Sequence, residues 1–105
     1  MTVKIREFKP ASKNTLRGFV AVELPSGMII RDITIHARDG KAWASPPGKP
    51  ILDREGRHMR DHNGRSRYTP VVEFTSRERR DFFSALVMDA LRAQHPDALD
   101  GEGAP

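Results

Sequence analysis

Apolar and polar residues alternate along three segments of the N-terminal half, which is the pattern of half-buried strands. The first segment covers residues 3–8 and is expected to end at Pro10, because proline has no amide hydrogen for a strand ladder. The second covers residues 16–24 and the third residues 28–35, with a Pro25-Ser26-Gly27 turn between them. Such short connections favour antiparallel pairing, so the three segments predict the start of a meander.

The third strand leads into a predicted turn and a fourth strand. Ile29, Ile33 and Ile35 share one parity, so we expect that face to be buried. Asp39-Gly40 predicts a tight turn, since glycine adopts a positive φ at little cost. The short strand after this turn carries Trp43, the only tryptophan of the chain. A single large aromatic residue on a short strand predicts a core position.

The chain becomes polar and rich in proline and glycine between residues 45 and 67. Pro46, Pro47 and Pro50 exclude a central strand here, because proline fixes φ and donates no ladder bond. We expect residues 48–67 to form a flexible loop or a weak hairpin at the sheet edge. Loops of this length are uncommon in compact domains unless they bind something or are disordered, so the length indicates one of these two. No internal repeat is evident in the chain.

The C-terminal part predicts a last strand over residues 71–74 and then one helix from Ser76 to His95. Thr75 and Glu78 have the spacing of a capping box, and Pro96 cannot be accommodated inside the helix. One apolar stripe is expected to face the sheet, formed by Phe82, Phe83, Leu86, Val87, Ala90 and Leu91.

These elements predict an α+β fold, an antiparallel meander of four to five strands packed by one long C-terminal α-helix, with a long basic loop. A chain of 105 residues suits one domain with a single core. We assign that domain to residues 1–96 and a flexible acidic tail to residues 97–105. The sequence has no apolar run that would span a membrane and no secretory signal pattern, so we expect a cytoplasmic location without membrane contact.

Composition narrows the function classes. The chain has no cysteine, which excludes disulfides and thiolate chemistry. Its 18 Lys and Arg residues outnumber 14 Asp and Glu residues and give a net charge of +4. Thirteen of the basic residues are arginines, which favours bidentate contacts to phosphate or carboxylate. A GC-rich genome produces the same arginine bias without any functional cause.

Catalytic and metal-binding motifs are weak. His58 and His62 have the i, i+4 spacing of helical metal ligands, but glycines flank this segment and no third ligand is placed. No serine has the setting of a nucleophile, and no Gly-rich phosphate loop occurs. His36 is expected to be a partly exposed strand residue and not a base. We therefore predict a protein that is not an enzyme and has no metal, no cofactor and no small-molecule substrate.

The element order and several short motifs resemble the stage V sporulation protein G (SpoVG) family over most of residues 3–92. The matching segments are Ile30-Arg31-Asp32-Ile33-Thr34-Ile35, Asp39-Gly40, Trp43-Ala44-Ser45-Pro46, Asp53-Arg54-Glu55-Gly56 with Arg60-Asp61, and the helix from Ser76. The chain departs from the family in a longer segment before Tyr68 and in a basic residue displaced to Lys49. The resemblance implies a small, site-specific nucleic-acid-binding regulator that is usually a homodimer, with binding around the C-terminal helix.

Nine basic residues are the predicted contacts to DNA or RNA phosphates: Lys49, Arg54, Arg57, Arg60, Arg65, Arg67, Arg77, Arg79 and Arg80. The last three lie at a helix N-terminus, whose free amides also attract anions. Glu78 and Asp81 interrupt them, so a solvated face with weak ion pairs is the alternative role. No aromatic row for base stacking is evident, and only Tyr68 and Trp43 are candidates.

The alternative function for the whole protein is an interaction or assembly module that dimerises through an exposed sheet edge and is basic only incidentally. The sequence distinguishes neither DNA from RNA nor a single strand from a duplex.

Overall fold

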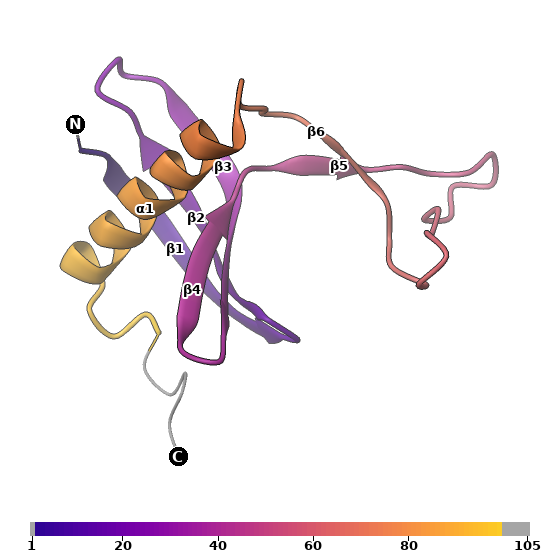
Figure 1. Cartoon of the computed structure of the whole chain (residues 1–105), viewed down its shortest axis with the longest axis horizontal. Helices are drawn as coiled ribbons and strands as arrows, with labels where there is room; N and C mark the ends of the chain where they lie inside the picture. The colour runs from indigo at the N-terminus through magenta and orange to yellow at the C-terminus, as the bar shows by residue number, and fades with distance from the viewer. Residues whose placement is uncertain (1, 100–105) are drawn as a thin grey trace.

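The computed structural model describes residues 2–99 and has one main sheet and one helix. Four strands form this antiparallel sheet in chain order: β1 (Lys4–Lys13), β2 (Leu16–Glu23), β3 (Ile29–Arg38) and β4 (Lys41–Ser45). The helix α1 (Arg77–Gln94) lies across one face of the sheet (Figure 1). The predicted α+β fold, an antiparallel meander packed by one C-terminal helix, is confirmed.

The core lies between α1 and the inner face of the sheet. Its largest fully buried side chains are Val20, Val22, Ile33, Ile35, Val87 and Leu91. Each such side chain stabilises the fold by about 1.5–3 kcal/mol relative to an exposed one. Phe82 was expected in the helix stripe but is 51% exposed, because it lies about 140° round the helix from Val87. Met88, which was not expected in the stripe, is buried.

A β-bulge decides which isoleucines of β3 face the core. The register between β2 and β3 shifts by one residue beside Asp32, whose φ is 63°. One extra residue exchanges the two faces of a strand on one side of the bulge. Ile30 therefore packs against the core, whereas Ile29 is 39% exposed. The predicted burial is confirmed for Ile33 and Ile35 and wrong for Ile29.

The first strand continues through Pro10, where it was expected to end. Pro10 pairs with Gly18, and β1 extends to Lys13 with a register shift in between. β1 is at the edge of the sheet, and an edge strand tolerates proline because one side of it needs no amide donor. The position of the strand within the sheet, which the local sequence does not show, decides this outcome.

The predicted turn at Asp39-Gly40 is confirmed. Asp39 and Gly40 have φ values of 53° and 79°, as a type I′ hairpin turn requires, and β3 and β4 pair directly on either side of it. The predicted core position of Trp43 is wrong. Ala44 is buried against the helix side, and the neighbouring Trp43 therefore points to the outer face, where it is 36% exposed.

Two side chains of α1 bond to the two edge strands. The Ala44 amide of β4 donates to Ser84 Oγ at 2.9 Å. The Ile5 amide of β1 donates to Gln94 Oε1 at 3.0 Å. Ser84 lies near the middle of the helix and Gln94 at its C-terminal end, so the two bonds fix the direction of the helix across the sheet.

The helix begins with a different cap from the predicted one. Ser76 is the N-cap, and its Oγ accepts a hydrogen bond from the Arg79 amide at 3.1 Å. The capping box over Thr75 and Glu78 is therefore wrong, because Glu78 lies one position before the residue that would reach back to the cap. The helix itself ends at Gln94, close to the predicted boundary.

The chain after α1 stays against the core as far as the structure describes it. Ala98 and Leu99 are half-buried and pack on the core cluster. The packed region therefore extends beyond the domain boundary expected at residue 96. The rest of the predicted acidic tail, residues 100–105, lies outside the described residues.

A second, two-stranded sheet contains β5 (Gly48–Pro50) and β6 (Tyr68–Pro70), which pair with each other and not with the main sheet. The strand predicted over residues 71–74 is wrong. These residues form bends and irregular structure that lead from β6 to the helix, and Val71 is 54% exposed. Their apolar character resembles a strand, but no neighbouring strand pairs with them.

Candidate nucleic-acid interface

Residues 48–70 form an arm that leaves the sheet after β4 (Figure 1). The pair β5–β6 forms its base, and backbone pairing continues beyond it. The Ile51 amide donates to the Arg67 carbonyl at 2.9 Å, and the Arg67 amide donates to the Met59 carbonyl at 2.8 Å. Of the two forms expected for this segment, loop or hairpin, the structure has the hairpin.

Two turns of the same construction lie in the arm, at residues 53–57 and 61–65. Each has Asp first, Gly fourth and Arg fifth. Asp53 Oδ1 accepts hydrogen bonds from the third and fifth amides at 2.9 and 2.9 Å, and Asp61 Oδ1 does the same at 2.8 and 3.0 Å. The two glycines have φ values of 81° and 78°. The expectation of no internal repeat is therefore wrong, and the eight-residue spacing of Asp, Gly and Arg was the signal for it.

The arm concentrates positive charge away from the sheet. It contains six Lys and Arg residues and three Asp and Glu residues. Arg57 pairs with Asp53 at 3.5 Å and also contacts Glu55, and Arg60 Nη1 donates to the Gly64 carbonyl at 2.8 Å. Four of the six Lys and Arg side chains of the arm form no ion pair within residues 2–99: Lys49, Arg54, Arg65 and Arg67.

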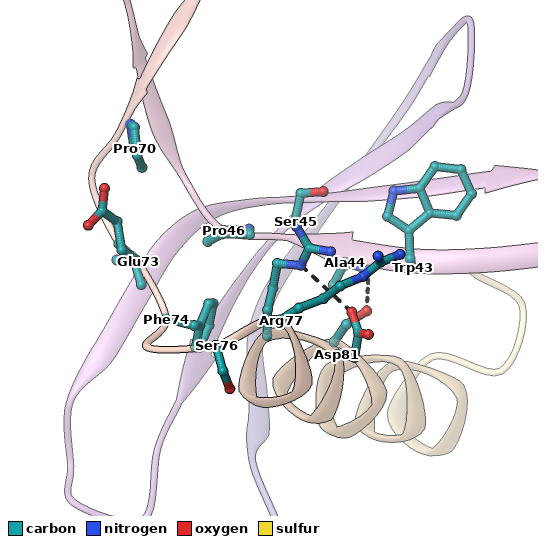
Figure 2. A pocket seen from close by; sticks show the side chains of 13 residues that line it. Trp43, Ala44, Ser45, Pro46, Pro70, Glu73, Phe74, Ser76, Arg77 and Asp81 are labelled. Carbon is teal, nitrogen blue, oxygen red and sulfur yellow. Dashed lines mark hydrogen bonds and ion pairs between the residues drawn. The ribbon is translucent and has the colours of Figure 1, made fainter.

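The helix-start arginines do not form one group. Arg77 and Arg80 line an open cleft of about 870 Å³ between α1, β4 and the end of the arm at Pro70 (Figure 2). Arg80 Nε lies 3.6 Å from Asp81 Oδ1, a weak exposed pair. Arg79 is exposed outside this cleft, because two positions correspond to about 200° round a helix. The structure therefore brings two of the three arginines to the end of the arm.

The outer face of the sheet carries an aromatic pair that sequence reasoning did not identify. The rings of His36 and Trp43 stack with centroids 5.5 Å apart and planes 12° apart. His36 Nδ1 lies 2.9 Å from Thr15 Oγ1, and its Nε2 lies 3.0 Å from Thr34 Oγ1. Burial, followed by the nearby Arg17 guanidinium, lowers the pKa of His36. The imidazole is thus neutral at neutral pH and fixed at both nitrogens.

The sheet edges offer little continuous backbone to a second chain. On β4 the Ala44 amide is already bonded to Ser84 of the helix. On β1 the register shifts twice, between Ile5 and Glu7 and between Pro10 and Lys13. Bulges and proline are features that prevent edge-to-edge pairing. These features disfavour pairing along β1 and β4, and the dimer through a sheet edge stays a prediction.

The two histidines of the arm lie outside any helix, in and beside its two turns. Their i, i+4 spacing consequently does not place the rings on one helical face. Within residues 2–99, no group of three or more His, Cys, Asp or Glu residues is arranged to hold a metal ion. The one helix in this part of the chain lacks the long apolar stretch that crossing a membrane requires.

Comparisons with protein-family models, with curated proteins and with solved structures find no match to this chain. The resemblance to the SpoVG family therefore stays a prediction from the motifs.

Proposed function

We propose that this protein is a small nucleic-acid-binding regulator that contacts phosphates through its arm and the start of α1. The observation that carries the proposal is the arm, a paired and exposed hairpin with a surplus of arginine and lysine. Each phosphate contact by such a residue releases counterions and favours binding.

Two of the three acidic residues of the arm have a structural role in its turns. The carboxylates of Asp53 and Asp61 accept backbone amides and close the two turns. They therefore serve to present the arginines that follow them, Arg57 and Arg65. The two turns thus present an arginine from the same backbone geometry, although Arg57 is paired with Asp53 and Glu55 and Arg65 forms no ion pair within residues 2–99.

The cleft at the helix start extends this surface. Arg77 and Arg80 line it beside the end of the arm, so a phosphate backbone that follows the arm meets further cations there. Arg79 contributes only to the general positive field. A regulatory role, a homodimer and a cytoplasmic location follow from the SpoVG resemblance and belong to this proposal.

The test is the retention of duplex DNA, single-stranded DNA and RNA at rising salt. We expect binding at low salt that weakens steeply as salt is added. Replacing Arg77 and Arg80 together by Gln is expected to weaken binding and leave helix content unchanged, whereas Arg79→Gln has a smaller effect. The proposal is refuted if none of the three nucleic acids binds at low salt.

A further inference from the structure

We infer that the outer face of the sheet binds the bases of single-stranded nucleic acid, while the arm holds the phosphates. This inference rests on the proposed function and specifies its ligand. It starts from a groove of about 640 Å³ between the sheet and the base of the arm. Leu16, Phe19 and His36 line it from the sheet, and Gly48 and Tyr68 line it from the arm.

The groove is aromatic and has little charge. Phe19 is 38% exposed and Tyr68 is 59% exposed. Among the described residues that line the groove, Asp32 is the one charged side chain. A carboxylate repels phosphate but accepts hydrogen bonds from the amino groups of bases. The groove therefore suits bases and excludes the backbone of the ligand.

The stacked pair continues this surface towards the helix. His36 lines the groove, and Trp43, which stacks on it, lines the cleft that also contains Arg77. Figure 2 shows Trp43 and Arg77 on the two sides of that cleft. A base that stacks on the exposed indole extends a stack of nearly parallel rings, the arrangement that single-strand binders use. Phe19, His36 and Trp43 thus form a path from the groove to the cations of the cleft.

The position of the nearest basic residue indicates which ligand the groove binds. The arm wall of the groove continues from Gly48 directly into Lys49 on β5. A single-stranded nucleic acid whose bases lie on the sheet can thus place its phosphates against the arm. Duplex DNA hides the faces of its bases within the stack and cannot use the groove. The expected ligand is therefore single-stranded DNA or RNA, with little dependence on base sequence because every base has a π-face.

Tryptophan fluorescence tests this inference directly, because the chain has one tryptophan. The probe is oligothymidine of about 12 nucleotides, within the usual site sizes of single-strand binders. An abasic oligonucleotide of equal length has the same phosphates without bases. We expect oligothymidine to quench the Trp43 emission and to bind more tightly, and the abasic strand to bind weakly without quenching.

The matched variants are Trp43→Leu on the sheet and Phe82→Leu, an exposed aromatic residue on the helix. We expect Trp43→Leu to weaken binding of oligothymidine between about 5-fold and 160-fold, as the loss of one stacking ring does. Its salt dependence should stay unchanged because no phosphate contact is lost. Phe82→Leu should bind as the wild type does. Tyr68→Leu removes an aromatic ring from the groove itself and tests the inference if Trp43→Leu does not fold.

The outcomes separate the two proposals. Oligothymidine binding that depends on the arm arginines but not on Trp43 or Tyr68 overturns the inference and leaves the proposed function standing. Duplex binding as tight as single-strand binding also overturns the inference and leaves the proposed function standing. Emission that changes with protein concentration and not with the oligonucleotide assigns the face to a second copy of the chain and overturns the inference. No binding of any nucleic acid overturns both.

Discussion

The arm makes a quantitative prediction about salt. Arg54, Arg65 and Arg67 are exposed and form no ion pair within the part of the chain that the structure describes. Replacing the three by Gln removes three cations and keeps the acidic residues that close the turns. We expect the fold to be unchanged, because the core contains none of them.

The magnitude follows from counterion release. Each phosphate contact contributes about −0.7 to the slope of log K against log salt for a single strand and about −0.9 for a duplex. If all three arginines contact phosphates, the slope of the variant is shallower by about 2.1 on a single strand and about 2.7 on a duplex. Over a fourfold rise in salt, the single-strand affinity of the wild type then falls about 20-fold further than that of the variant.

The assay is fluorescence anisotropy of a labelled strand at several salt concentrations. The control variant replaces Lys4, Lys13 and Lys41 by Gln, which changes the net charge equally but at exposed positions on β1 and at the start of β4. Its slope should match that of the wild type. An equal effect in both variants would mean that only net charge matters, and an unchanged slope in the arm variant would show that the arm does not contact phosphates.

Three further predictions concern the scaffold. In Gly18→Ala the new Cβ would lie 2.5 Å from the Phe8 ring and 2.8 Å from a backbone oxygen, so we expect a loss of about 1–3 kcal/mol in the free energy of unfolding, measured with urea. Ser84→Ala leaves the Ala44 amide without its acceptor and should lower the same free energy by about 1 kcal/mol. Because the pKa of His36 is lowered from 6.5 by folding, its contribution to stability is full above that value and is lost as the pH falls towards the folded-state pKa. The urea midpoint should therefore fall more on acidification in the wild type than in His36→Gln.

Local patterns were sufficient for the elements whose signal is short-range. Asp39-Gly40 predicted its turn because positive φ at two successive positions strongly restricts the residue types. The helix was predicted almost to its ends from its apolar period and Pro96. The cap was placed one residue early, since both Thr75 and Ser76 are residue types that cap helices and the chain's approach to the helix decides between them.

Positions that depend on a neighbouring strand could not be predicted in the same way. The bulge beside Asp32 changes the side to which Ile29 and Ile30 point, and it is visible only against β2. Pro10 is tolerated because β1 has a free side. The outward position of Trp43 follows from Ala44 facing the helix, which requires the helix to be in place.

The candidate site also has features that follow from the sequence and features that follow from the tertiary structure. The sequence by itself determined the α+β class, the helix, the hairpin turn and the set of cations, because these depend on residue type and on spacing along the chain. Only the tertiary structure decided how the cations are grouped. It separated Arg79 from Arg77 and Arg80, closed two equivalent turns in the arm, and placed His36 and Trp43 together on the open face of the sheet. These groupings join residues that are distant in sequence, and their packing depends on the register of the whole sheet.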